Sequence, residues 1–123
     1  MPTEPLLRNR RILVVEDDYF IAGDMRDGLL AQGALVAGPV ATVREALKLV
    51  EAGQLDGAVL DVNLGEEDSF PVAQALRAAG VPFVFVTGYN SGDLPSAWAD
   101  VRRLEKPASA RTVARELFGA SAA

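Results

Sequence analysis

The chain has 123 residues, half of them hydrophobic, and a formal net charge of −5. This length accommodates one domain with its own core, and the composition excludes a disordered chain. The absence of cysteine and histidine excludes disulfide scaffolds, zinc sites, histidine-dependent catalysis and histidine phosphocarriers. The acidic charge argues against direct binding to nucleic acid, and no apolar run is long enough for a membrane span. We therefore expect a soluble cytoplasmic protein whose chemistry uses carboxylates, hydroxyls and basic side chains.

Apolar strands and amphipathic helices alternate along the chain. The strands are short runs rich in β-branched and apolar residues, and the helices carry apolar residues at intervals of three and four. In chain order we expect strand 12–15, helix 19–32, strand 34–37, helix 43–52, strand 58–60, helix 72–79, strand 83–86, a short or irregular helix within 88–100, strand 101–104 and helix 110–118.

Turn and capping residues indicate where these elements begin and end. Gly38 and Pro39 predict the end of the second strand. Thr42 and Glu45 form a capping box at the start of the second helix. Asp18 is expected to cap the first helix with its side chain.

Five strand–helix units predict an α/β fold with a parallel sheet between two layers of helices. Right-handed crossovers favour the flavodoxin-like (βα)5 doubly wound sheet with strand order 2-1-3-4-5. We expect a flexible N-terminal lead over 1–10, one domain over 11–119, a short tail over 120–123, and no output domain.

Polar residues follow the strands of this predicted sheet at one edge. Glu16 and Asp17 follow the first strand and Asp61 follows the third, so three carboxylates would converge at the point where ligands bind in this fold. Like charges this close destabilise one another unless they share a cation, and oxygen ligands suit Mg²⁺ or Mn²⁺. Thr87 and Lys106 end the fourth and fifth strands and add a hydroxyl and an ammonium. The set suits phosphoryl transfer to Asp61.

Four segments in this order resemble the receiver domain of two-component response regulators. They are ILVVEDD (12–18), LDVNL (60–64), FVTGY (85–89) and LEKP (104–107). The resemblance implies that Asp61 accepts a phosphoryl group from a histidine kinase or a histidine phosphotransfer protein. Such a chain is a signalling phosphoacceptor, not an enzyme that turns over a free substrate.

The resemblance also implies a role for each neighbour of Asp61. Asp17 would bind Mg²⁺ directly, Glu16 would bind it through water, and Asn63 would offer its backbone carbonyl. Thr87 and Lys106 would contact the phosphoryl group. A cis bond between Lys106 and Pro107 would aim the lysine into the crevice.

The stretches PFVFVTGY (82–89) and DVNLGEEDSFPVAQAL (61–76) further resemble the FATGUY subgroup of receivers, with Val86 where the nickname has alanine. Members of this subgroup are commonly single-domain receivers that work with HWE or HisKA2-type kinases. Arg103 stands three residues before Lys106, where many receivers have tyrosine or phenylalanine. A switch based on rotation of that ring is therefore in doubt here.

Two residues after the fourth strand are expected to modulate the reaction. Tyr89 would slow loss of the phosphoryl group by screening Asp61 from water, and Gly88 would leave room for the kinase histidine. Glu66 and Glu67 are most simply explained as part of a solvated loop. By analogy with the family, the kinase would contact the first helix, at Phe20, Ala22 and Arg26.

Two other functions fit parts of the pattern. A pseudo-receiver would use the same fold only as a protein-interaction module, although all five site residues are present. A Toprim-like or phosphatase-like Mg²⁺ domain would need an acid two residues after Asp61, where the chain has Asn63. A phosphorylation shift that is lost in Asp61→Ala would separate a receiver from a pseudo-receiver.

Overall fold

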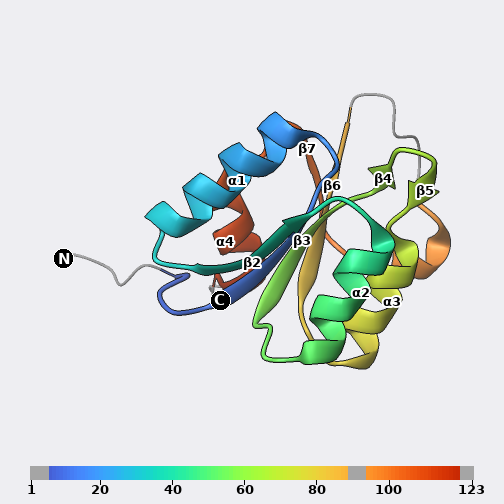
Figure 1. Ribbon diagram of the computed structural model, residues 1–123, viewed down its shortest axis with the longest axis horizontal. Helices are drawn as coiled ribbons and strands as arrows, with labels where there is room; N and C mark the ends of the chain where they lie inside the picture. Colours follow the sequence, from blue (N-terminus) through green and yellow to red (C-terminus); the bar gives the residue numbers. More distant parts are fainter. Residues whose placement is uncertain (1–5, 89–93, 120–123) are drawn as a thin grey trace.

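A five-stranded parallel sheet forms the centre of the computed structural model, which describes residues 6–88 and 94–119 (Figure 1). A separate antiparallel hairpin of two strands, β4 (Asn63–Leu64) and β5 (Glu67–Asp68), follows the third strand of the sheet. Without this hairpin the spatial order is the predicted 2-1-3-4-5, so the flavodoxin-like fold is confirmed. Across the sheet the strands are β2 (Leu35–Val40), β1 (Arg11–Val15), β3 (Gly57–Asp61), β6 (Phe83–Thr87) and β7 (Arg103–Glu105).

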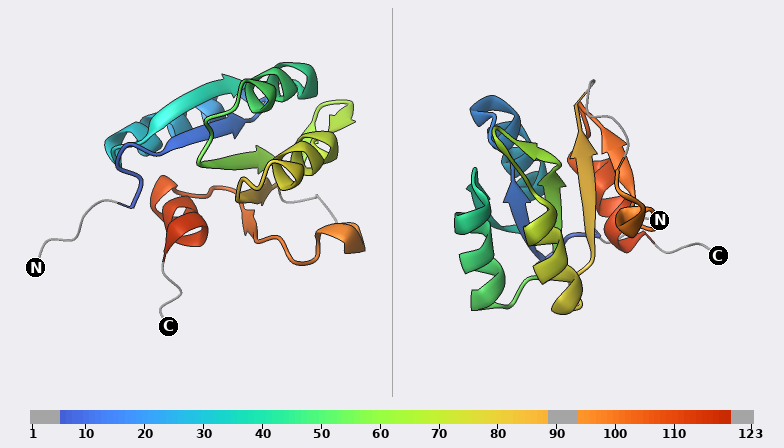
Figure 2. Two further views of the ribbon diagram at one scale, coloured as in Figure 1. Left: turned by 90° about the horizontal axis from the view of Figure 1, so that it is seen from below. Right: turned by 90° about the vertical axis from the view of Figure 1, so that its right-hand side faces the viewer.

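Helices cover both faces of the sheet, as Figures 1 and 2 show. Helices α1 (Tyr19–Ala31) and α4 (Ala110–Phe118) lie on one face, and α2 (Val43–Ala52) and α3 (Phe70–Ala78) lie on the other. Among the described residues, no helix combines the length and the apolar character needed to cross a membrane.

The core consists of two apolar layers, one on each face of the sheet. Leu13 and Val15 of β1 pack on the side of α2 and α3, whereas Ile12 and Val14 pack on the side of α1 and α4. All four side chains are fully buried. This burial on both faces explains why β1 is a continuous apolar run and not an alternating one.

The predicted helix caps are present. The Asp18 carboxylate accepts hydrogen bonds from the backbone amides of Phe20 and Ile21 at 2.9 and 3.0 Å. Thr42 Oγ1 accepts from the Glu45 amide at 3.1 Å, which is the first bond of the expected capping box at the start of α2. The Glu45 carboxylate accepts from the Ala41 amide at 3.3 Å in place of the Thr42 amide that a full box would use.

Strand β2 is longer than predicted. The prediction that Gly38 and Pro39 end this strand is wrong, because β2 continues to Val40. The pairing with β1 shifts between Leu13 and Val15, so a local irregularity accommodates the two residues. Because β2 is an edge strand, the missing amide hydrogen of proline can face away from the ladder.

The N-terminal stretch also differs from the expectation. Residues 6–10 form a turn in which Leu7 is fully buried against α1 and α4. The Asn9 amide donates to the Gly33 carbonyl at 2.9 Å. Residues 6–10 therefore belong to the packed structure, so the prediction of a flexible lead is wrong for them.

The part of the crossover between β6 and β7 that the structure describes is irregular, as predicted. This part, 94–102, contains only the 3-10 helix η1 (Ser96–Trp98) and no α-helix. The last strand starts at Arg103 and not at the predicted residue 101. Pro95 and the short length of the segment explain the absence of a regular helix.

Trp98 anchors this crossover to the sheet. Its ring centre lies within about 6 Å of three other ring centres, and Arg77 stacks over it at 4.5 Å. Arg77 also pairs with Asp100 at 2.9 Å. The three partner rings are those of Phe70, Phe83 and Phe85.

We predict that Trp98→Ala lowers the free energy of unfolding by about 3 kcal/mol, because it leaves a cavity inside this aromatic cluster. Urea unfolding followed by circular dichroism measures the change. The control is Tyr19→Ala, which removes an aromatic side chain that is 84% exposed and should cost no more than about 0.5 kcal/mol. Equal losses in the two variants would contradict the packing role of Trp98.

Candidate functional site

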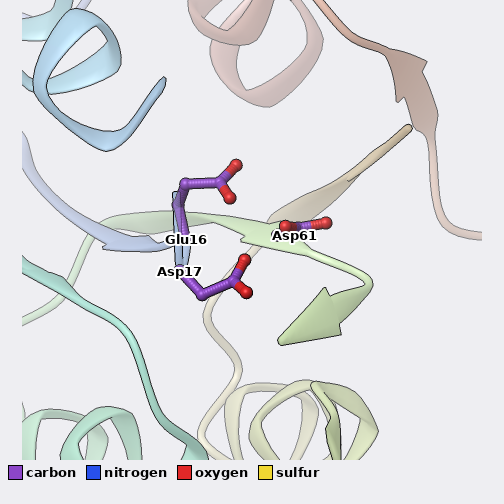
Figure 3. Close-up of side chains that lie close together, drawn as sticks. All are labelled: Glu16, Asp17 and Asp61. Atoms are coloured by element: carbon purple, nitrogen blue, oxygen red, sulfur yellow. The ribbon is translucent and has the colours of Figure 1, made fainter. Parts of the chain in front are cut away.

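Three carboxylates meet where β1 and β3 end. The two strands are parallel neighbours in register, with Val15 opposite Leu60, so the residues that follow them lie side by side. Each of Glu16, Asp17 and Asp61 offers an oxygen within 4.8 Å of the other two (Figure 3). The predicted convergence of these acids is confirmed.

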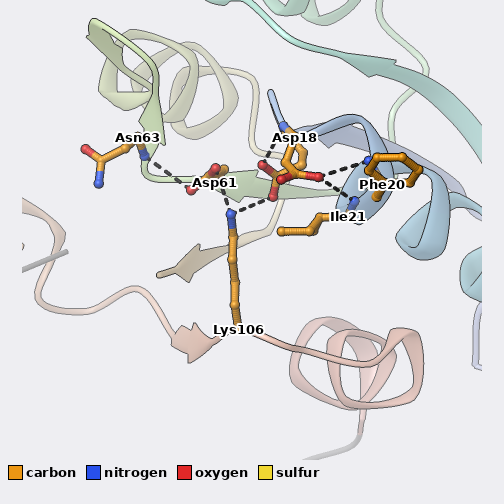
Figure 4. Close-up of polar contacts among 7 residues, drawn as sticks. Asp18, Phe20, Ile21, Asp61, Asn63 and Lys106 are labelled. Atoms are coloured by element: carbon orange, nitrogen blue, oxygen red, sulfur yellow. Dashed lines mark hydrogen bonds and ion pairs between the residues drawn. The ribbon is translucent and has the colours of Figure 1, made fainter. Parts of the chain in front are cut away.

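Lys106 lies against two of these acids. Its Nζ is 2.8 Å from Oε1 of Glu16. The same nitrogen is 2.9 Å from Oδ2 of Asp61 (Figure 4). The backbone places it there, because the Lys106 amide donates to the Thr87 carbonyl at 2.9 Å as β7 leaves the sheet. The bond between Lys106 and Pro107 is cis.

Backbone amides hold the remaining oxygens of the same two acids. The Asp18 amide donates to Oε2 of Glu16 at 3.1 Å, and the Asn63 amide donates to Oδ1 of Asp61 at 3.3 Å. Each carboxylate therefore has one oxygen on Lys106 and one on the turn that follows its own strand. Both carboxyl groups are fixed in place by these contacts.

Burial makes this site electrostatically costly. Glu16 is 7% exposed and Asp61 is 5% exposed. Burial, together with the bond to Asp61, raises the pKa of Glu16 from its ordinary 4.5 to about 7, although Lys106 and the Asp18 amide act in the opposite direction. Burial alone would lower the pKa of Lys106, but its bonds to Glu16 and Asp61 leave that pKa above its ordinary value. Negative charge thus exceeds what Lys106 offsets.

The donor set of this cluster suits a metal ion. It consists of three carboxylates, two of them buried and one, Asp17, exposed. Carboxylate oxygens favour hard divalent cations, and a cation would relieve the excess negative charge. The cluster can therefore hold a metal ion among its three carboxylates.

An apolar cavity of about 700 Å³ adjoins the acids on the side of α1 and α4. Its walls include Val59 and Val86 of the sheet and Met25 of α1. It reaches Glu16, Asp61 and Lys106, so these charged groups border apolar surface on one side. Such surroundings strengthen the ionic contacts within the site.

The comparison with protein families gives the same result as the geometry. Residues 12–111 match the response regulator receiver domain family. The chain belongs to this family.

Solved structures of other receivers are similar to this one. The solution structure of SdrG from Sphingomonas melonis Fr1 has a TM-score of 0.78 and 43% identity, and the match covers 91% of this chain and 94% of SdrG. A BeF3-activated conformation of SdrG, from Pseudomonas melonis Fr1, has a TM-score of 0.71 and 44% identity, covering 85% of this chain and 90% of that one.

A curated relative is similar over a shorter stretch. The transcriptional regulatory protein PdtaR of Mycobacterium tuberculosis is 28% identical over 86 residues. The match covers 69% of this chain and 42% of PdtaR, so this receiver spans less than half the length of that relative.

Four other residues are predicted to belong to the receiver site, and the structure describes three of them. Thr87 ends β6 and is buried one residue beyond Val86, the partner of Asp61 in the sheet. Gly88 follows it and lines the apolar cavity. Arg103 is exposed on the edge strand β7. Tyr89 lies outside the described residues.

Helix α1 offers two of its three predicted kinase contacts to solvent. Phe20 is 79% exposed and Arg26 is also exposed, whereas Ala22 is buried. Ala22 therefore offers little surface to a partner, although it lines a pocket together with Phe20 and Arg26. Tyr19 lies edge-on to Phe20, with ring centres 5.5 Å apart, and forms an exposed aromatic pair with it.

The structure places Glu67 in a strand, not in the solvated loop that the sequence predicts. Glu67, which the sequence suggests is part of a solvated loop, belongs to the β4–β5 hairpin and accepts a hydrogen bond from the Val43 amide at 3.1 Å. The sequence signal for the hairpin is Gly65 followed by Glu66, a two-residue turn with glycine at its first position. The contact with Val43 has no local signal, because 24 residues separate the partners.

The raised pKa of Glu16 predicts how stability depends on pH in the metal-free receiver. Between about pH 4.5 and pH 7 the folded state retains a proton that the unfolded chain has released, so Glu16 makes folding less favourable as the pH rises through this window. Glu16→Gln is neutral throughout. From about pH 5 to pH 8, we expect the free energy of unfolding of this variant to rise by about 2 to 3 kcal/mol relative to that of wild type.

Urea unfolding of both proteins in EDTA, at about pH 5 and about pH 8, measures this difference in the free energy of unfolding. Glu66→Gln, which removes a charge from an exposed position in the hairpin turn, serves as the control and should follow the wild type. Parallel pH profiles for Glu16→Gln and wild type would contradict the predicted proton uptake by Glu16.

Proposed function

We propose that this receiver accepts a phosphoryl group on Asp61, in a Mg²⁺-dependent reaction, from a histidine kinase or a histidine phosphotransfer protein. The observation that carries the proposal is the buried Asp61 carboxylate at the end of β3, with Lys106 at 2.9 Å and two other acids within 4.8 Å. A carboxylate alone at a strand end would not need a lysine and two acids around it. These partners suit an acceptor whose charge changes during the reaction.

The transfer step needs one bond to break and one to form. An oxygen of Asp61 attacks the phosphorus of the donor phosphohistidine, the P–N bond breaks, and the electron pair returns to the imidazole nitrogen. Lys106 would neutralise part of the negative charge that the phosphoryl group adds, because its ammonium already contacts Asp61. The Thr87 hydroxyl would donate to a phosphoryl oxygen from the neighbouring strand.

Mg²⁺ would be held by Asp17 and Asp61 directly, by Glu16 through water, and by the backbone carbonyl of Asn63. It would neutralise phosphoryl oxygens while they lie among these acids. The clustering of the three carboxylates supports this assignment. The existence of a BeF3-activated conformation of SdrG, a receiver 44% identical to this one, supports a phosphorylated state here, since BeF3 imitates a phosphoryl group.

The finer features of the proposal concern signalling. The phosphorylated chain would act in the cytoplasm, as a receiver of the FATGUY subgroup, through protein contacts or by passing its phosphoryl group on. Its kinase would be of the HWE or HisKA2 type. Gly88 would leave room for the donor histidine, and Tyr89 would slow hydrolysis. Arg103 would modulate the site from the position where many receivers have the aromatic switch residue.

The direct test is phosphorylation of the purified chain by a histidine kinase, followed by mobility shift on a phosphate-binding gel. We expect a shifted band for wild type in Mg²⁺, no shift in EDTA, and no shift for Asp61→Asn. Glu51→Gln, an exposed change on α2 at the opposite face of the sheet, is the control and should shift like wild type. A wild-type chain that never shifts with any kinase of its source would instead favour the pseudo-receiver.

The exposed aromatic pair on α1 generates a second prediction. Exposed aromatic residues at a docking surface often contribute a large share of the binding energy, so Phe20→Ala should slow phosphotransfer from the kinase by about tenfold or more. Phosphorylation by acetyl phosphate, which needs no docking surface, should be unchanged. Leu30→Ala, at the far end of the same helix and 50% exposed, is the control. Equal kinase rates for Phe20→Ala and Leu30→Ala would rule out docking at Phe20.

A further inference from the structure

The β4–β5 hairpin starts two residues after Asp61. Asn63 pairs with Asp68 and Leu64 pairs with Glu67, and the Ser69 amide closes the base by donating to the Val62 carbonyl at 2.9 Å. The hairpin is therefore an ordered structure with a defined register. The segment that contains Asn63 cannot move without moving its partner strand.

The turn of this hairpin lies beside the acid cluster. Gly65 has a φ of +76°, and a Cβ placed on it would lie 3.9 Å from Oδ2 of Asp17. Leu64 is buried in the core on the side of α2 and α3. The backbone of the hairpin thus forms one side of the proposed cation site. Leu64 fixes this backbone by packing into the core.

Glu67 connects the hairpin to helix α2. Its Oε2 accepts a hydrogen bond from the Val43 amide at 3.1 Å. Val43 is the first residue of α2, and Thr42 and Glu45 satisfy other donors at this helix end. A carboxylate at a helix N-terminus is also stabilised by the helix dipole. Glu67 therefore links two elements that flank the site, with a charge-assisted bond.

We propose that Glu67 is a positioning residue for the divalent cation. By tying β5 to α2, it holds β4 and the turn against the acid cluster, which keeps Asn63 and Gly65 in place beside Asp17 and Asp61. The side chain of Glu67 does not reach the cation in this role. The proposal rests on the proposed Mg²⁺-dependent function, which it deepens by adding the element that shapes the cation site.

Two observations support positioning as the role of Glu67. The contact joins residues 24 positions apart, so it restrains tertiary structure and does not merely cap a local turn. Glu66 carries the same charge on the same hairpin and is also exposed, yet it makes no hydrogen bond with the described residues. Comparing these two neighbours separates the effect of the contact from the effect of negative charge near the site.

The experiment measures Mg²⁺ affinity by isothermal titration calorimetry for wild type, Glu67→Ala, Glu67→Gln and Glu66→Ala. Loss of an orienting contact outside the ligand shell should weaken Mg²⁺ binding by about threefold to tenfold in Glu67→Ala. Glu67→Gln keeps an oxygen acceptor without the charge and should fall between Glu67→Ala and wild type. Glu66→Ala should bind Mg²⁺ like wild type.

Two further readouts distinguish positioning from a general loss of stability. Hydrogen exchange of the Val43 amide in the metal-free protein should be faster in Glu67→Ala than in Glu66→Ala. The initial rate of phosphorylation by acetyl phosphate should fall at low Mg²⁺ and return to the wild-type rate at saturating Mg²⁺. A merely structural role would lower the rate at every Mg²⁺ concentration.

Three results would overturn the inference. They are an unchanged Mg²⁺ affinity in Glu67→Ala, an equal loss in Glu66→Ala, and a rate that saturating Mg²⁺ does not restore. If Glu67→Ala fails to fold, Glu67→Gln decides, and wild-type affinity in that variant overturns the inference. A wild-type chain that binds no Mg²⁺ would overturn the proposed function as well, whereas unchanged Glu67 variants beside a wild type that binds would overturn this inference alone.

Discussion

The structure depends on the electrostatic balance at the carboxyl ends of β1 and β3. Three acids share this place with one lysine, and Glu16 and Asp61 are almost completely buried. Lys106 contacts both of them, but it carries one positive charge against two or three negative ones. Such an arrangement is unfavourable for the apo chain and favourable for a chain that binds a cation, and this preference supports the proposed metal-dependent phosphorylation of Asp61.

The parallel sheet brings these charged groups together. Each strand delivers its terminal residue to the same edge, so β1, β3, β6 and β7 bring an acid, a second acid, a hydroxyl and an ammonium together without any long loop. The apolar layers on both faces then keep these strand ends in register. The hairpin after Asp61 adds a feature that the sheet does not supply, because it closes the site from the side of α2 and is tied there through Glu67.

The sequence predicts the parts of the fold that depend on local patterns or on parallel topology. The strand order, the helix caps and the convergence of the acids all followed in this way. It did not predict that β2 continues through Gly38 and Pro39, because an edge strand tolerates residues that would interrupt a central one. The contact between Glu67 and Val43 was also not predictable, since only the folded chain brings these two positions together.

Paramagnetic broadening by Mn²⁺ tests the shared-cation account most directly. In a titration of the isotope-labelled chain, substoichiometric Mn²⁺ should selectively broaden the amide signals of Glu16, Asp17, Asp61 and Asn63, and excess Mg²⁺ should restore them. Broadening centred on acids elsewhere, such as Asp56, or no selective broadening at all, would contradict the claim that the tips of β1 and β3 form a cation site.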